Sequence, residues 1–153
     1  MTKKVTKAVI PAAGLGTRML PIARTVPKEM LPIVDRPAIS YLVEEAAASG
    51  ITDVLIITNR NKETIENYFD YSPEYEQKLH EAGKDAYIEQ IREICSKVNV
   101  MFLRQLETKG LGHAVLRAKA FVGDEPFAVL YGDDIIISET PVVKQLTEVY
   151  ERT

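Results

Sequence analysis

Four short apolar runs constrain the fold of this chain more than any other feature of its sequence. None of them alternates regularly between apolar and polar residues, as a strand with one face in water would. Unbroken runs of this length are typical of strands that are buried on both faces, in a parallel sheet covered by helices. The predicted strands are residues 7–11 (KAVIP), 53–58 (DVLIIT), 99–103 (NVMFL) and 127–131 (FAVLY).

Helical patterns lie between and after these runs. The alternation of strands and helices predicts a doubly wound, Rossmann-like α/β domain whose mainly parallel sheet is flanked by helices. The long crossover from Asn59 to Lys97 is periodic, which indicates extra helices and not a disordered loop. The predicted helices are residues 37–49, residues 62–70, a segment that begins at Ser72-Pro73, the stripe from Ile88 to Val98, residues 113–121, and a last helix with Thr140 as N-cap and Pro141 in its first turn.

Composition limits the classes of function. The 153 residues fit one domain, and a hydrophobic content of 46% can fill one core. A net charge of -3 argues against a dedicated nucleic-acid binder. The single cysteine, Cys95, excludes an internal disulfide and a thiolate-rich metal site, and favours a reducing compartment. Because no apolar run approaches the length of a membrane span, we expect a cytoplasmic protein with no membrane or nucleic-acid partner.

The last predicted helix lacks the signals that usually end a helix. The last predicted helix runs to Glu151-Arg152-Thr153 with neither a capping glycine nor a polar tail. A genuine short protein is expected to end with a capped helix. We therefore expect a domain that is incomplete at its C-terminus.

Polar and glycine residues follow each predicted strand. Because the carboxyl ends of parallel strands open onto the same edge of a sheet, these residues are expected to meet there. Glycines, cations, an amide and carboxylates at one edge predict a phosphate ligand with a divalent metal. The residues concerned are 11–18 after the first strand, Asn59 and Arg60 after the second, Arg104, Gln105 and 109–113 after the third, and 132–134 after the fourth.

The loop after the first strand favours a phosphate ligand. Gly14 and Gly16 are expected to adopt positive φ angles and to let backbone N–H groups approach a ligand closely. The loop is not a dinucleotide fingerprint, because Met19 stands where the third glycine should be, and no GxxxxGK[ST] loop occurs in the chain. Arg18 follows the glycines and Lys28 stands in PKEMLP, and two such cations suit a triphosphate. Taken alone, however, the loop is more typical of a tight turn that carries two surface cations, because short glycine motifs often match by chance.

Five motifs together narrow these alternatives. VIPAAGLGTRMLP, PKEMLPIVDRPAI, KETIENYFD, KGLGHAV and the GDD after the last strand occur in this order. Together they closely resemble the bacterial UTP–glucose-1-phosphate uridylyltransferases, a branch of the sugar nucleotidyltransferase family. The resemblance runs from Lys7 to about Ile136 and covers only the first half of such proteins. It implies that residues 1–153 are the nucleotide-binding part of a sugar nucleotidyltransferase domain.

The resemblance also implies a role for each site residue. Arg18 would hold the outer phosphates that leave as pyrophosphate, Lys28 would hold the phosphate under attack, and Asp133 would ligate Mg²⁺. Gln105 would hydrogen-bond the uracil edge, Gly110 would pack beneath the base, and the first loop would meet the ring through backbone groups of Ala13 and Gly14. The residues implied to bind the nucleotide are Ala13, Gly14, Leu15, Gly16, Thr17, Gln105 and Gly110.

The implied reaction transfers UMP from UTP to glucose 1-phosphate and gives UDP-glucose and pyrophosphate. The parent protein is expected to be a homo-oligomer. Glucose 1-phosphate is already an anionic nucleophile, so alignment and charge neutralisation suffice without a general base. The family's sugar-binding residues, a second lysine and a second acidic metal ligand lie beyond this chain, so weak or no turnover is predicted for it alone. Two alternatives stay open: a non-catalytic module that binds UTP or a UDP-sugar, and a thymidylyltransferase of the same family.

The remaining candidates are given structural roles. Asp35 is predicted to be a helix N-cap. Asp134 is predicted to point away from the metal, because adjacent residues on an extended chain point opposite ways. His80 in a polar helix and His113 in the GLGHA loop are predicted to be structural and not general bases. Packing or an oligomer contact is predicted for a series of tyrosines, Tyr68, Tyr71, Tyr75 and Tyr87.

Overall fold

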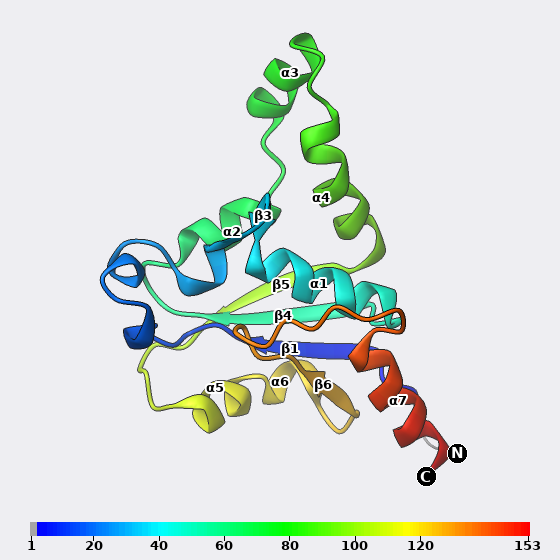
Figure 1. Cartoon of the computed structure of the whole chain (residues 1–153). Coiled ribbons are helices and arrows are strands. Elements are labelled where there is room, and N and C mark those ends of the chain that lie inside the picture. The colour runs from blue at the N-terminus through cyan, green and yellow to red at the C-terminus, as the bar shows by residue number, and fades with distance from the viewer. Residues whose placement is uncertain (1–2) are drawn as a thin grey trace.

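A computed structural model describes residues 3–153 (Figure 1). Its centre is a four-stranded sheet in the order β5-β4-β1-β6, in which every pair of neighbours is parallel. The strands are β1 (Lys7–Pro11), β4 (Asp53–Thr58), β5 (Asn99–Arg104) and β6 (Phe127–Val129). The predicted parallel sheet is therefore confirmed. Only its last strand is shorter than predicted, although Leu130 still donates its N–H to the Val9 carbonyl at 3.0 Å.

Helices cover both faces of the sheet. In Figure 1, α1 lies on one face, and α5 and α6 lie on the other. The seven helices are α1 (Ala38–Ala48), α2 (Glu63–Phe69), α3 (Pro73–Glu81), α4 (Ala86–Lys97), α5 (Leu111–Arg117), α6 (Lys119–Val122) and α7 (Val142–Arg152). The long crossover is helical as predicted, with α3 and the adjoining end of α4 projecting away from the sheet. The segment predicted as one helix over 113–121 consists of two helices, and the first of them begins two residues earlier than predicted, at Leu111.

Successive residues of the central strands enter two separate cores. On β4, Val54 and Ile56 pack in the cluster that includes Ile39 and Leu42 of α1. Leu55 and Ile57 pack in the other cluster, with Ala114 of α5. Both faces of the sheet are thus buried, and this explains why the strand sequences show no polar alternation.

Two predicted helix caps are wrong, and a third is right only in position. Asp35 lies in the turn of a hairpin formed by β2 (Pro32–Ile33) and β3 (Arg36–Pro37), and α1 begins after Pro37. The N-cap position of α7 is Pro141 and not Thr140. The free N–H of Val143 at this helix start instead donates to Glu45 Oε1 at 3.1 Å. Ser72 is the N-cap residue of α3, but its side chain makes no capping hydrogen bond.

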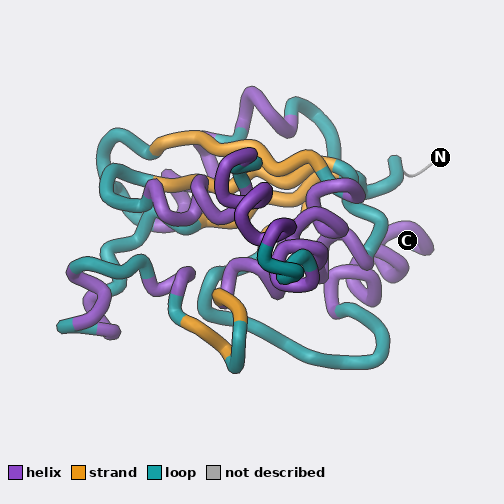
Figure 2. The backbone as a smooth tube through the Cα atoms, turned by 90° about the horizontal axis from the view of Figure 1, so that it is seen from above, coloured by secondary structure: helices purple, strands orange, loops and turns teal. Residues whose placement is uncertain are grey.

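The segment between β1 and α1 carries several elements that the sequence pattern did not indicate. Three short 3-10 turns follow β1, and Figure 2 shows the β2–β3 hairpin apart from the main sheet. The turns are η1 (Thr17–Met19), η2 (Ile22–Arg24) and η3 (Lys28–Met30). They fold the segment back over the carboxyl edge of the sheet, which brings Lys28 beside the fourth strand's loop. Among the residues described, no helix is long and apolar enough to cross a membrane.

Candidate functional site

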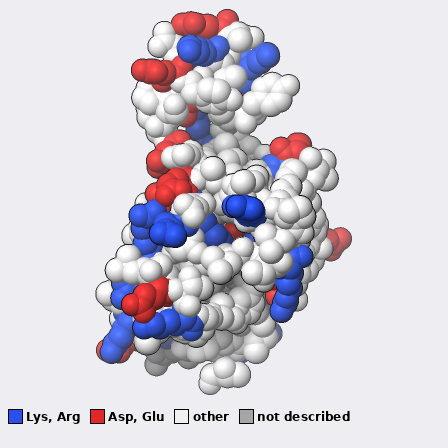
Figure 3. Space-filling view, turned by 90° about the vertical axis from the view of Figure 1, so that its left-hand side faces the viewer, with Lys and Arg blue, Asp and Glu red and all other residues white. Residues whose placement is uncertain are grey.

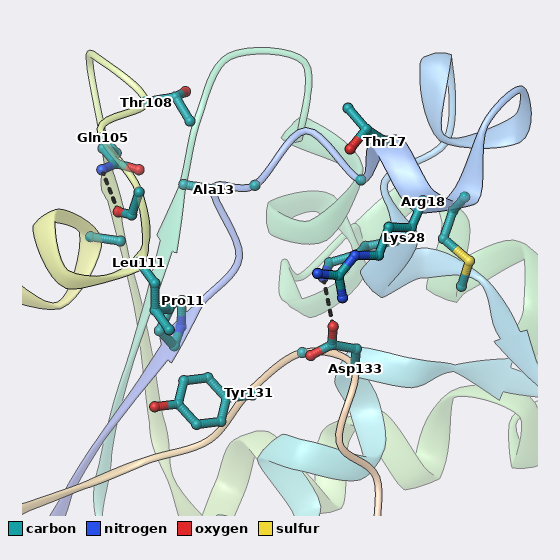
Figure 4. A pocket seen from close by; sticks show the side chains of 16 residues that line it. Pro11, Ala13, Thr17, Arg18, Lys28, Gln105, Thr108, Leu111, Tyr131 and Asp133 are labelled. Carbon is teal, nitrogen blue, oxygen red and sulfur yellow. Dashed lines mark hydrogen bonds and ion pairs between the residues drawn. The ribbon is translucent and has the colours of Figure 1, made fainter.

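A cavity of about 480 Å³ opens at the carboxyl edge of the sheet. Loops that follow β1, β5 and β6 line it, together with Lys28 of η3. Figure 3 faces this edge and shows Lys and Arg side chains gathered around a hollow. Figure 4 shows Arg18 and Lys28 on one side of the cavity and Gln105 on the other. Cationic side chains and the polar side chain of Gln105 therefore face each other across one space.

The structure brings nearly all of the predicted site residues together. Leu15 is the exception, because it is 66% exposed and lines the two cavities next to this one. Asp133 lines the cavity and Asp134 does not. The predicted residues that line the cavity are Ala13, Gly14, Gly16, Thr17, Arg18, Lys28, Gln105, Gly110 and Asp133.

The two loop glycines differ from each other. Gly16 has a φ of 67°, and a Cβ added there would lie 3.1 Å from the Ala23 Cβ, so both conformation and space require glycine. Gly14 does not have the predicted positive φ. A Cβ at Gly14 would meet nothing within 4 Å, so this backbone is open to an approaching ligand.

Carbonyl groups of the glycine loop are held from beneath by two side chains that follow β4. Asn59 Nδ2 donates to the Ala13 carbonyl at 2.5 Å. Lys62 Nζ donates to the Ala12 carbonyl. Both side chains come from buried residues. With its carbonyls turned toward these donors, the loop has a fixed path beside the cavity.

A buried ion pair supports this arrangement. Lys62 Nζ lies 3.1 and 3.0 Å from Oε1 and Oε2 of Glu29, whose exposed fraction is 0%. Burial lowers the pKa of the Lys62 ammonium, and the Glu29 carboxylate opposes part of that shift. A Cβ on Gly132 would lie 3.2 Å from Glu29 Cγ, so the loop after β6 also packs on this pair. The pair therefore lies beneath three of the segments that surround the cavity.

Sequence reasoning missed Glu29 and Lys62. Their motifs, PKEM and KETIENYF, were recognised, but a charged residue in a motif gives no sign that its side chain is buried. Asn59 was placed at the correct edge without a role. Tyr131 and Thr108 also line the cavity and were not predicted, whereas Leu111 was placed at this edge without a role. Their positions just beyond β5 and β6 are the signal that could have found them.

The cationic side of the cavity contains an ion pair between distant segments. Lys28 Nζ lies 3.2 Å from Asp133 Oδ2. The hydrogen bond from Lys28 lowers the pKa of the Asp133 carboxyl, so this group is an anion at neutral pH. An incoming phosphate would therefore compete with Asp133 for Lys28.

Few side chains around the cavity can ligate a divalent metal. The described residues contain no group of three or more His, Cys, Asp or Glu side chains that could hold a metal ion. Asp133 is the one carboxylate among the cavity-lining residues. A single carboxylate fits Mg²⁺ but not Zn²⁺, because Mg²⁺ in nucleotide sites commonly takes its other ligands from phosphates and water.

The polar wall opposite the cations is formed by Gln105. Its side chain is 3% exposed, and its backbone N–H donates to the Thr58 carbonyl at 2.7 Å. Its amide nitrogen donates to the Gly110 carbonyl at 3.5 Å and lies 2.7 Å from His113 Nδ1. Gly110 has a φ of 87°, a conformation that favours glycine. The loop between β5 and α5 is thus folded back onto the Gln105 amide.

Comparisons with known proteins agree with this geometry. A sequence model of the nucleotidyl transferase family matches residues 7–152. The chain is 61% identical over 151 residues to the UTP–glucose-1-phosphate uridylyltransferase YngB of Bacillus subtilis, with 99% of this chain and 51% of that protein covered. A second UTP–glucose-1-phosphate uridylyltransferase of the same organism is 55% identical, with 99% and 52% covered. The chain spans about half the length of the curated relatives it matches.

Solved structures show the same relationship. An apo UDP-glucose pyrophosphorylase is 47% identical with a TM-score of 0.89, and the match covers 97% of this chain and 55% of that one. A UTP-bound enzyme of this kind from Acinetobacter baumannii is 41% identical with a TM-score of 0.91, covering 97% and 53%. A Bacillus anthracis structure described as a glucose-1-phosphate thymidylyltransferase is 23% identical with a TM-score of 0.71, so it supports the fold alone. On the family match over nearly its whole length, the chain belongs to the nucleotidyl transferase family.

Proposed function

We propose that residues 1–153 form the nucleotide-binding part of a UTP–glucose-1-phosphate uridylyltransferase, a cytoplasmic enzyme that makes UDP-glucose and pyrophosphate. The observation that carries this proposal is the meeting of Arg18, Lys28, Gln105 and Asp133 around one cavity. The names of the relatives, and the UTP and UDP-glucose named with two of the solved structures, support the choice of nucleotide. The single free cysteine supports the compartment.

In this proposal the base lies against the wall opposite the cations. Gln105 hydrogen-bonds the uracil edge, and Gly110 packs beneath the ring. The ring also meets backbone groups of Ala13 and Gly14, and Leu15, Gly16 and Thr17 continue the loop around the nucleotide. The open backbone at Gly14 supports such close contact.

The phosphates lie toward the cations. Arg18 holds the outer phosphates through its planar guanidinium, which suits bidentate contact with phosphate oxygens. Lys28 exchanges the Asp133 carboxylate for the α-phosphate. An oxygen of glucose 1-phosphate then attacks the α-phosphorus, and the bond from that phosphorus to the departing pyrophosphate breaks. Alignment and charge neutralisation are what these residues contribute.

Asp133 is the residue proposed to hold Mg²⁺. When bound, the ion would supply further neutralisation of phosphate charge. The Asp133 carboxylate would become available as Lys28 turns to the nucleotide. Among the described residues that line the cavity, Asp133 is the one carboxylate available to the metal.

Calorimetric titration of the chain with UTP, dTTP and ATP, each with Mg²⁺, tests the proposal. UTP is expected to bind with much higher affinity than ATP, because the uracil edge can hydrogen-bond Gln105 and the adenine edge differs from it. Equal binding of UTP and ATP would contradict the proposal, and a preference for dTTP would favour a thymidylyltransferase. Pyrophosphate release from UTP and glucose 1-phosphate is expected to be weak or absent with this chain alone. UTP binding combined with no turnover even in a full-length protein would favour a non-catalytic binding module.

A further inference from the structure

The orientation of the Gln105 amide decides which bases it can read. One end of the amide donates hydrogen bonds and the other accepts them. The end that lies 3.5 Å from the Gly110 carbonyl must be the nitrogen, since a carbonyl oxygen only accepts. In Figure 4 a dashed line marks the hydrogen bond that this nitrogen donates, and the amide oxygen lies on the side of Ala13, toward the cavity.

His113 reinforces this orientation. Its Nδ1 lies 2.7 Å from the same amide nitrogen, a shorter contact than the one to Gly110. Because an amide nitrogen only donates, Nδ1 accepts in this arrangement, which corresponds to the tautomer with its ring proton on Nε2. The Gly110 carbonyl also accepts the Ala114 N–H at 3.1 Å. The Gln105 amide therefore shares the Gly110 acceptor with a second donor, and His113 Nδ1 is its closer partner.

The amide oxygen of Gln105 has no hydrogen-bond partner within residues 3–153. A group that only accepts, directed into the cavity, selects for a base that presents a ring N–H. Uracil presents N3–H at its Watson–Crick edge, whereas N3 of cytosine is itself an acceptor and would face the Gln105 oxygen unpaired. A site of this kind discriminates strongly, because the mismatched polar groups lose their partners.

We propose that His113 is a specificity-determining positioning residue, which holds the Gln105 amide nitrogen so that the amide oxygen selects a uracil base over a cytosine base. This inference rests on the proposed function, because it requires the nucleotide base to lie at Gln105. Without the Nδ1 acceptor, only the 3.5 Å contact to the shared Gly110 carbonyl favours this orientation, so the amide can turn over more readily and present its nitrogen to the cytosine N3.

The test compares His113→Phe, which keeps a planar ring but removes the acceptor, with His113→Asn, whose Oδ1 can accept near the position of Nδ1. Binding of UTP, CTP and pyrophosphate with Mg²⁺ is measured by calorimetry for each variant and the wild type. In His113→Phe the preference for UTP over CTP is expected to fall about tenfold, while pyrophosphate affinity stays within about twofold. His113→Asn is expected to recover most of the preference.

A folded His113→Phe variant that keeps the wild-type preference would overturn the inference and leave the proposed function intact. Equal losses for UTP, CTP and pyrophosphate would also overturn it, because they would mean that His113 merely supports α5. If the wild type itself shows no preference for UTP, the proposed function fails and the inference with it. Circular dichroism identifies a variant that does not fold, in which case His113→Ala takes the place of His113→Phe.

Discussion

The carboxyl edge of the sheet differs from the side formed by β6 and α7. The two regions differ in the burial of their side chains and in the contacts that these side chains make. At the carboxyl edge even a charged pair, Glu29 and Lys62, is buried with hydrogen-bond partners. Beside β6, Leu146 and Val149 of α7 are 65% and 60% exposed. A cavity of about 570 Å³ separates α7 from the strand. In Figure 1, α7 lies at the right of the sheet and the loops of the carboxyl edge lie at its left.

The difference indicates that polar contacts hold the loops around the cavity at the carboxyl edge. The glycine loop is held by Asn59 and Lys62, and the loop after β6 packs on Glu29. None of these contacts involves α7. We therefore expect changes at the buried pair to damage both stability and binding, whereas changes on the exposed face of α7 leave nucleotide binding intact.

The largest effect is expected for Lys62→Met. This substitution leaves the Glu29 carboxylate buried without its partner and removes the donor to the Ala12 carbonyl. A loss of about 3–5 kcal/mol in the free energy of unfolding is expected, measured by denaturant titration. Lys97→Met is the matched control, because the Lys97–Glu93 pair is exposed and should contribute less than about 1 kcal/mol. Equal effects of the two substitutions would show that the buried pair is not what holds this edge.

The next effects separate base binding from phosphate binding. Gln105→Ala is expected to weaken UTP binding about tenfold and to leave pyrophosphate binding unchanged, since only the base loses a partner. Arg18→Ala is expected to weaken UTP binding by a similar factor while hardly changing UMP binding. Calorimetry on both variants, with Lys144→Ala as an exposed control on α7, measures these losses. If Gln105→Ala weakened UTP and pyrophosphate equally, Gln105 would not read the base.

A smaller effect follows from the lowered pKa of Asp133. Because the folded state holds this carboxylate charged at lower pH than the unfolded state does, its stabilisation is present above the unfolded pKa. It is lost as the pH falls through the folded pKa, in the range below about pH 4. The Asp133 side chain is 56% exposed, so the contribution should be only about 0.5 kcal/mol.

Unfolding of the wild type and of Asp133→Asn, compared between pH 7 and pH 2.5, measures this contribution. The wild type is expected to be slightly more stable at pH 7, and the difference should disappear at low pH. A difference that grows as the pH falls would contradict the sign derived from the Lys28–Asp133 pair.

The smallest effect is expected on the exposed face of α7. Leu146→Ser and Val149→Ser remove apolar groups that are already largely in water, so the free energy of unfolding should change by no more than about 0.5 kcal/mol. UTP affinity should stay within about twofold of the wild type. A loss of UTP binding in either variant would mean that the two regions are coupled.

The sequence predicted the sheet because each central strand is buried on both faces, which leaves an apolar run that is easy to recognise. Helix caps were less predictable, because they depend on distant partners. The free N–H of Val143 is satisfied by Glu45, far away in the chain, and residues 32–37 pair as a hairpin where Asp35 was expected to cap α1. Local patterns contain no information about such contacts.

The same distinction holds for the site. The rule that parallel strands end at one edge predicts that Arg18, Gln105 and Asp133 lie close together. It gave no indication of Glu29 and Lys62, since burial of a charged side chain depends on the segments that cover it. Residues that face a ligand were thus predictable from strand ends, and residues that hold the backbone were not.

Amide chemical-shift mapping by NMR locates nucleotide binding residue by residue in a chain of 17.1 kDa. On titration with UTP and Mg²⁺, we predict shifts for the amides of residues 12–18, 104–113 and 131–134, with none for the exposed turns of α7. Shifts centred on the β6–α7 cavity, or no shifts in a folded chain, would contradict the conclusion that the carboxyl edge of this sheet is the nucleotide site.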